Sequence, residues 1–140
     1  MPRLLLYRNY MINYHNLKKS ARYATRGMVS VWREEQNFRI EICGGLVAIF
    51  LGLVLQFSFI ELSIIVLLVG SILAAECVNT ALERIVDILK PRVSEYVQVV
   101  KDILAAMMAI LVSVSVLIAL FLYVPKIVTV FAIVIQAIFR

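Results

Sequence analysis

Charge, glycine, cysteine and histidine are all scarce in this sequence. Asp, Glu, Lys and Arg make up only 16% of the 140 residues and apolar residues make up 63%, against roughly 25% charged and 45–50% apolar residues in soluble domains. The mean hydropathy of +0.96 agrees with this imbalance, which excludes an ordinary water-soluble fold. The chain has five glycines and contains neither G-x-x-x-x-G-K-[ST] nor G-x-G-x-x-G, so both common glycine-rich phosphate-binding loops are excluded as well.

The two cysteines and the one histidine give no site. Cys43 and Cys77 stand alone in apolar stretches without a second Cys or His at metal-ligand spacing, so they indicate neither a disulfide framework nor a zinc site. We interpret both as apolar packing residues. His15 is assigned no catalytic part, because no Ser or Asp is suitably placed around it. The apolar run within residues 1–6 is too short for the core of a signal peptide, so we expect no cleaved leader.

What the sequence does have is long apolar runs. Residues 42–60 contain no charge and residues 62–75 contain none either, with Glu61 between them, which predicts two helices joined by a very short hairpin. A helix needs about 20 residues to cross a hydrocarbon core of about 30 Å. The second helix must therefore continue past residue 75, and we predict it over 62–89, ending at the proline of the following Lys-Pro-Arg run.

A third membrane helix is predicted over residues 102–124, closed by Pro125 because proline lacks the amide donor. Residues 126–140 form an apolar tail that is too short to cross the bilayer again. Residues 1–40 carry eight of the 14 Lys and Arg, interleaved with aromatic residues, which is typical of an amphipathic helix at a lipid surface. The expected fold is thus an all-α membrane protein, a single domain with three transmembrane helices plus an N-terminal amphipathic surface helix.

The basic residues also predict the orientation of the chain. Eight lie before the first membrane helix and four lie between Arg84 and Lys101, whereas the hairpin around residues 56–61 has none. Since Lys and Arg near the ends of membrane spans stay in the cytoplasm, the N-terminus and the second loop are expected to be cytoplasmic, and the C-terminus to lie on the opposite side.

The second predicted helix carries a stripe of polar residues. At about 100° per residue, Asn79, Glu83 and Asp87 all lie within about 60° of Glu76 around the helix axis. At about 1.5 Å per residue from the start of the helix, Glu76 is still inside the hydrocarbon core and Glu83 is near its cytoplasmic edge. A carboxylate at that depth costs several kcal/mol unless it is paired, hydrated or bound to a metal, so it is a functional candidate.

Structural explanations of the stripe remain open. Glu83 and Asp87 can simply mark the solvated end of a helix, and Glu76 can be hydrogen-bonded across a helix bundle. Against this, like charges one or two turns apart repel each other unless something positive lies between them. Oxygen ligands at the membrane edge suit Mg²⁺, which keeps waters and commonly bridges phosphates.

Two further polar groups converge on the same membrane edge. Lys101-Asp102 opens the third predicted helix, and Glu35 with Phe38, Arg39 and Glu41 lies just before the first. A lysine at this level is either a snorkelling anchor or the natural contact for an ATP phosphate.

These blocks and the intervals between them resemble a known family, the small bacterial integral-membrane lipid kinases that comprise diacylglycerol kinase and undecaprenol kinase. The run Glu35-Gln36-Asn37-Phe38-Arg39-Ile40 and the run Asn79-Thr80-Ala81 are more similar to the undecaprenol kinase branch. The matching elements are Ala24-x-x-Gly27, Glu35-x-x-Phe38-Arg39, Glu76-x-x-Asn79-x-Ala81-x-Glu83-x-x-x-Asp87 and Lys101-Asp102.

The resemblance implies a homotrimer in the bacterial inner membrane, with active sites shared between protomers and open to the cytoplasm. It implies transfer of the γ-phosphate of MgATP to the hydroxyl of a membrane lipid alcohol, with no nucleic-acid partner. Glu76 would be the general base, and Glu35 and Glu83 would hold Mg²⁺. The residues that would bind or position the nucleotide are Asn79, Lys101, Asp102, Asp87 and Tyr23.

The sequence departs from the family pattern in two places, and other functions stay open. Glu95-Tyr96 is displaced from its usual position in the second loop without a following His, and a Gly common soon after Lys101-Asp102 is absent. These differences bear on lipid preference, so diacylglycerol remains the alternative substrate to undecaprenol. A small ion or proton transporter coupled through Glu76 is the alternative of another class, although no inverted repeat is visible, and an assembly subunit would not need aligned carboxylates.

The orientation can be tested by cysteine labelling in intact cells. In a background with Cys43 and Cys77 replaced, single cysteines at positions 20 and 94 should be protected from an impermeant thiol reagent and a cysteine at position 58 should react, because ATP is available only in the cytoplasm. The reverse labelling pattern would leave the carboxylates without ATP and would contradict the kinase hypothesis.

Overall fold

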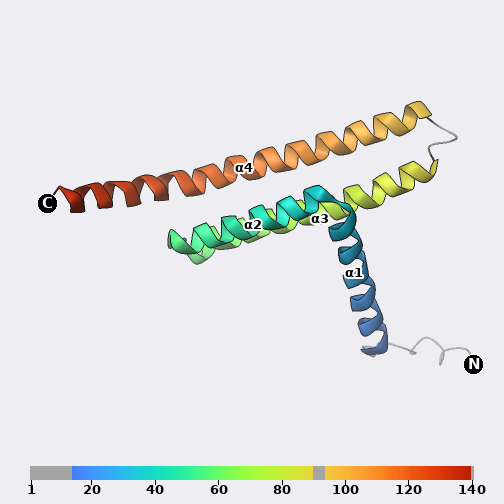
Figure 1. The fold of residues 1–140 in the computed structure, drawn as a ribbon, viewed down its shortest axis with the longest axis horizontal. Coiled ribbons are helices and arrows are strands. Elements are labelled where there is room, and N and C mark those ends of the chain that lie inside the picture. Colours follow the sequence, from blue (N-terminus) through green and yellow to red (C-terminus); the bar gives the residue numbers. More distant parts are fainter. Residues whose placement is uncertain (1–13, 90–93, 140) are drawn as a thin grey trace, which may run out of the picture. The chain divides into compact units, whose positions relative to one another are not determined.

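The computed structural model describes residues 14–89 and 94–139, in which it contains four α-helices and no β-strand. The helices are α1 (Tyr14–Glu34), α2 (Gln36–Val54), α3 (Phe59–Leu89) and α4 (Ser94–Ile138) (Figure 1). By length and composition, α2, α3 and α4 can each cross a membrane. The prediction of an all-helical protein with three membrane-spanning helices is therefore confirmed.

The chain divides into two compact units, of which α1 belongs to the first and α2, α3 and α4 form the second. The N-terminal segment predicted over 1–40 is helical from Tyr14 and ends at Glu34, and its residues 1–13 lie outside the described residues. Ser30 donates a hydrogen bond of 2.9 Å to the Glu34 carboxylate at the end of α1. The location of α1 at a lipid surface stays a prediction.

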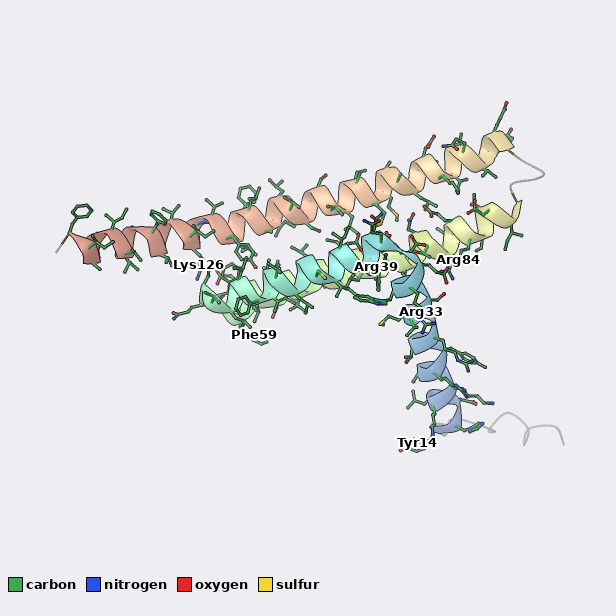
Figure 2. The ribbon with its side chains drawn as sticks, in the orientation of Figure 1. Tyr14, Arg33, Arg39, Phe59, Arg84 and Lys126 are labelled. Carbon is green, nitrogen blue, oxygen red and sulfur yellow. The ribbon has the colours of Figure 1, made fainter. Side chains whose placement is uncertain are left out.

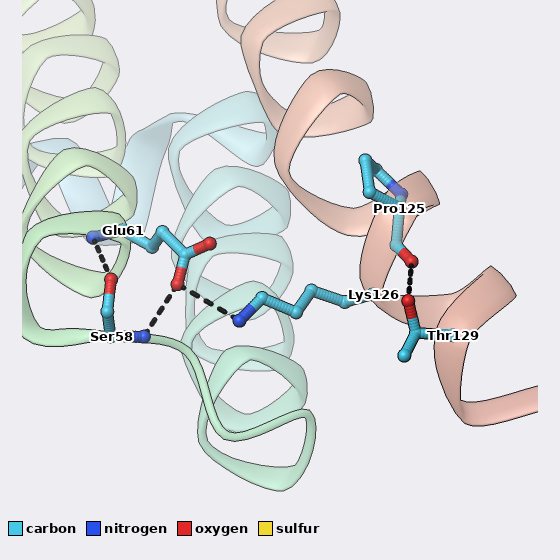
Figure 3. Close-up of polar contacts among 5 residues, drawn as sticks. All are labelled: Ser58, Glu61, Pro125, Lys126 and Thr129. Atoms are coloured by element: carbon cyan, nitrogen blue, oxygen red, sulfur yellow. Dashed lines mark hydrogen bonds and ion pairs between the residues drawn. The ribbon is translucent and has the colours of Figure 1, made fainter. Parts of the chain in front are cut away.

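The predicted boundaries of the first membrane helix, 42–60, are wrong at both ends. α2 already begins at Gln36 and ends at Val54. The early end has a local cause in a reciprocal capping box, in which the Ser58 N–H donates to Glu61 Oε2 at 2.6 Å and the Glu61 N–H donates to Ser58 Oγ at 3.3 Å (Figure 3). This box starts α3 at Phe59, so the last two residues assigned to the first helix belong to the second. The sequence signal was the Ser-x-x-Glu spacing.

Glycines allow α2 to approach its neighbours closely. An ideal Cβ built on Gly45 would lie 2.5 Å from Val69 Cγ1 on α3, and one built on Gly52 would lie 3.3 Å from a ring carbon of Phe57. The Tyr123 hydroxyl of α4 donates to the Ala48 carbonyl of α2. Contacts of 2.5 Å to a Cβ atom are essentially never found in proteins. The packing of α2 on α3 therefore depends on the missing side chain at Gly45.

The third membrane helix is much longer than predicted. α4 runs for 45 residues through Pro125, whereas the prediction of 102–124 placed its end there and treated 126–140 as a separate tail. Proline removes only one backbone donor, the one that would pair with the carbonyl four residues earlier, and membrane helices tolerate it. One turn later, the Thr129 hydroxyl donates to the Pro125 carbonyl at 2.8 Å (Figure 3). At its other end α4 begins at Ser94 and not at the predicted residue 102. The charged residues Lys101 and Asp102 do not interrupt a helix that extends beyond the apolar core.

An ion pair joins α4 to the hairpin end of α3. Lys126 Nζ lies 3.3 Å from Glu61 Oε2 (Figure 3). It also lies 5.8 Å from the centre of the Phe57 ring, and the centres of the Phe57 and Tyr123 rings are 4.7 Å apart with their planes tilted by 43°. In Figure 2, Lys126 lies toward the hairpin end of the α2–α3 pair, and Arg39 and Arg84 lie toward its other end. The second unit thus has two polar ends separated by apolar helix.

The capping box gives a prediction for stability. Ser58→Ala should lower the free energy of unfolding by about 1 kcal/mol, because the Glu61 amide loses its partner at the start of α3. Thermal or denaturant unfolding in detergent micelles measures the change. The matched control is Ser63→Ala on the same helix, where the hydroxyl only donates to the Phe59 carbonyl four residues back and the backbone bond remains. Equal stability of both variants would show that the box does not stabilise the hairpin.

Candidate active site

Four polar residues of α3 lie within about two turns of the helix, and two of them are buried. Glu76 is 3% exposed and Thr80 is 2% exposed, while Asn79 and Glu83 are half-buried. Positions three and four apart share a face of an α-helix, so the structure brings the predicted stripe together as expected. Asp87, one turn further, is exposed at the end of the stripe.

Carboxylates surround Glu76 from two helices. Glu35 and Glu83 lie close enough for their charges to repel that of Glu76, and Glu41 of α2 does the same. Glu35 occupies the N-cap position of α2 in an extended conformation, and its side chain makes no capping hydrogen bond. The start of α2 and the middle of α3 therefore create a concentrated negative charge next to a buried carboxylate.

Asn79 orients one of these carboxylates. Its Nδ2 donates to Glu83 Oε1 at 3.3 Å, one turn along α3. Its own Oδ1 is buried and has no hydrogen-bond partner, and the Thr80 hydroxyl oxygen is in the same state. Buried polar atoms are nearly always satisfied, so these two oxygens are available to accept a hydrogen bond from a water or a ligand.

The lysine predicted for the nucleotide lies beside the stripe. Lys101 Nζ of α4 is 2.7 Å from Asp87 Oδ1 of α3, and its charge is also attracted by Glu83. Asp102 instead accepts a hydrogen bond of 2.9 Å from Gln98 Nε2 on its own helix. The structure thus brings Lys101, Asp87 and Glu83 together and leaves Asp102 exposed on α4. Tyr23 is exposed on α1, which is a separate unit, so its predicted role stays a prediction.

The residues present fit a magnesium ion. Carboxylate and amide oxygens are the ligands that hard cations prefer, and the mutual repulsion of Glu35, Glu76 and Glu83 would be relieved by a divalent cation. Within residues 14–89 and 94–139 no three His, Cys, Asp or Glu side chains form a ready-made metal cage. This agrees with the way Mg²⁺ is usually held, by one or two carboxylates together with waters and substrate phosphates.

Sequence reasoning gave no role to two residues that the structure brings into this region. Glu41 follows the Arg39 block, and its Oε2 is buried without a partner. Thr80 lies one turn after Glu76, so the i, i+4 spacing was a signal for it. For Glu41 the signal was weak, because a carboxylate at the start of an apolar helix is usually solvated.

Comparison with known proteins identifies the family to which the chain belongs. A model of the prokaryotic diacylglycerol kinase family matches residues 22–123. The undecaprenol kinase of Bacillus subtilis (strain 168) is 31% identical over 108 residues, which cover 77% of this chain and 88% of the Bacillus protein. All the predicted site residues lie inside the matched segment, and the resemblance predicted from the sequence is confirmed. The chain therefore belongs to the prokaryotic diacylglycerol kinase family and is a membrane lipid kinase.

Proposed function

We propose that this lipid kinase uses MgATP to phosphorylate the hydroxyl of undecaprenol, with Glu76 as the general base. The observation that carries the proposal is the buried Glu76 carboxylate, flanked by acidic residues on a helix that crosses the membrane. The choice of lipid is supported by the similarity to the Bacillus undecaprenol kinase. Diacylglycerol is the second candidate, favoured by the name of the matching family.

In the proposed reaction Glu76 acts on the lipid hydroxyl. The hydroxyl oxygen forms a bond to the γ-phosphorus, the bond from that phosphorus to the bridging oxygen of ADP breaks, and the hydroxyl proton passes to Glu76 as ADP leaves. A base inside the hydrocarbon core, about two turns from its cytoplasmic edge, must meet a hydroxyl that is held near the headgroup level, so the lipid would place its hydroxyl slightly below that level.

Glu35 and Glu83 would hold Mg²⁺, and Asn79 would keep Glu83 in position through its hydrogen bond. When bound, the ion neutralises charge on the phosphates during the transfer. Lys101 would contact the ATP phosphates, with Asp87 positioning its ammonium group through the 2.7 Å contact. Asp102 and Tyr23 complete the proposed nucleotide-binding set.

We also propose the oligomeric state and the location. The protein forms a homotrimer in the inner membrane, and its N-terminus and active site face the cytoplasm. The distribution of basic residues supports this orientation, with eight before residue 42 and none in the hairpin. Each membrane helix buries few residues within the single chain. At most 17% of its apolar 18-residue segment is buried. Lipid and neighbouring protomers would cover the remainder.

The substrate can be tested with γ-radiolabelled ATP and two lipids side by side. In micelles or vesicles, undecaprenol should be labelled with a kcat/KM at least about tenfold above that for diacylglycerol, which corresponds to about 1.4 kcal/mol of transition-state preference. Preferential labelling of diacylglycerol would overturn the choice of lipid and leave the kinase assignment intact.

Two variants test the role of Glu76 as the base in the same assay. Glu76→Gln keeps the side-chain volume but cannot accept a proton, so activity should fall at least about a hundredfold while the protein still folds and binds nucleotide. The control is Glu61→Gln at the other end of α3, which loses the ion pair to Lys126 and should keep its turnover. Near-normal activity of Glu76→Gln would contradict its role as the base.

The metal requirement tests Glu35 and Glu83. Activity should vanish with EDTA and return with Mg²⁺, and Glu83→Gln and Glu35→Gln should each need more Mg²⁺ for half-maximal rate, because each variant removes one carboxylate ligand. A metal titration of the initial rate measures this. If neither single variant changes the titration midpoint, both residues have a structural role instead.

A further inference from the structure

Five hydroxyl groups in the described helices bond to their own backbone. Each donates to the carbonyl oxygen four residues earlier, at a distance of 2.7–2.9 Å. They belong to Thr25, Ser63, Ser71, Ser115 and Thr129. This is a common bond for Ser and Thr inside an α-helix, and it satisfies the hydroxyl without the help of any other element.

The hydroxyl of Thr80 on α3 does not make this bond. The residue is 2% exposed, and its buried Oγ1 has no hydrogen-bond partner within residues 14–89 and 94–139. A buried polar atom without a partner destabilises the folded state. Valine has nearly the same shape as threonine and would fill the same space without that cost. Packing alone therefore does not account for a threonine at this position.

Glu83 directs its carboxylate toward the turn that contains Thr80. Long side chains in an α-helix lean toward its N-terminus, and Glu83 does so, because its Oε1 accepts a hydrogen bond of 3.3 Å from Asn79 Nδ2 four residues earlier. At about 100° per residue, Glu83 lies between Asn79 and Thr80 around the helix axis, about 40° from the first and about 60° from the second. The carboxylate is thus flanked by the amide that it already uses and by the hydroxyl of Thr80.

The other carboxylate one turn from Thr80, that of Glu76, is placed less suitably. Glu76 precedes Thr80 by four residues, so a side chain that leans toward the N-terminus leads away from Thr80. Lys101 donates to Asp87 at 2.7 Å, further along α3. Glu83 is therefore the neighbouring acceptor that the Thr80 hydroxyl can serve.

We propose that Thr80 is a positioning residue for Glu83, and that its hydroxyl donates to Glu83 Oε2 while Asn79 holds Oε1. Two donors on opposite sides fix the plane of the carboxylate, which leaves its remaining lone pairs for the Mg²⁺ that Glu83 would hold. Carboxylates that bind metals are themselves hydrogen-bonded, and loss of such a partner costs about 10–100-fold in metal affinity or activity. This inference rests on the proposed function, because it concerns the metal ligand of that same site.

The first test measures metal binding without turnover. Binding of Mn²⁺ in the presence of the non-hydrolysable analogue AMP-PNP, followed by electron paramagnetic resonance, should weaken at least about tenfold in Thr80→Val. Thr80→Ser keeps the hydroxyl and should bind Mn²⁺ nearly as the wild type does. The matched control is Thr129→Val, which removes a hydroxyl bonded to the Pro125 carbonyl and should leave Mn²⁺ binding unchanged.

A double variant tests whether Thr80 acts through Glu83. In a Glu83→Gln background, Thr80→Val should cause little further loss of Mn²⁺ binding, because two residues that act on the same ligand do not contribute additively. A further loss as large as that in the wild-type background would show that Thr80 serves another group, and it would overturn the inference.

Thermal unfolding without a metal separates positioning from a structural role. Thr80→Val should have the same Tm as the wild type or a higher one, because it removes a buried hydroxyl that has no partner. A Tm that falls in Thr80→Val and recovers in Thr80→Ser would show that the hydroxyl stabilises the fold, contrary to the inference. If Thr80→Val does not fold, Thr80→Ala removes the same hydroxyl without adding volume and is subject to the same measurements.

Failure of this inference and failure of the proposed function give different results. Unchanged Mn²⁺ binding in Thr80→Val, with lipid phosphorylation by the wild type, would overturn the positioning role and keep the kinase proposal. If the wild type phosphorylated neither lipid, the proposed function would be wrong. Weaker Mn²⁺ binding in Thr80→Val but not in Thr80→Ser would then still support the role of the hydroxyl.

Discussion

The high free energy of a charge in hydrocarbon is the constraint on which the structure of this kinase depends. Carboxylates in an apolar helix must be paired, hydrated or bound to a cation, and the second unit of the chain meets this requirement differently at its two ends. At the hairpin end, Glu61 accepts from the Ser58 amide and pairs with Lys126. At the other end, Glu35, Glu41 and Glu83 add to the negative charge of Glu76. The carboxylate at the first end is thus paired with a lysine, whereas the buried Glu76 at the second end lies beside further carboxylates.

This difference distinguishes a structural carboxylate from a functional one within a single helix. Glu61 and Glu76 both lie on α3, yet only Glu76 is almost fully buried among like charges. Glu35 and Glu83 both raise the electrostatic cost of a charge on Glu76, whereas Lys126 lowers it for Glu61. Together with membership of a kinase family, this removes the reason to consider a transporter or a non-catalytic assembly subunit.

The sequence predicted the number of membrane helices and the polar stripe because both follow from helix periodicity and hydropathy. It failed where a single local interaction decides. The Ser58–Glu61 box sets the start of α3, and α4 continues through Pro125, where the sequence predicted its end. The unpartnered oxygens of Glu41 and Thr80 could not be predicted, because they depend on which faces of α2, α3 and α4 meet. A Cβ at Gly44, unlike one at Gly45, would meet nothing within 4 Å. The different surroundings of Gly44 and Gly45 depend on the same packing, and the sequence alone does not distinguish these two glycines.

The length of α4 connects this enzyme to the thickness of its membrane. The distance from Lys101 to Lys126 is about 37 Å along the helix, which exceeds a hydrocarbon core of about 30 Å. A tilt within the range observed for membrane helices, up to about 40°, absorbs this hydrophobic mismatch. The turns that follow Lys126 lie beyond the segment matched by the family and are apolar. A thicker bilayer would reduce the tilt of α4, and because Lys101 and Lys126 are tied to opposite ends of α3, α3 would have to tilt with it.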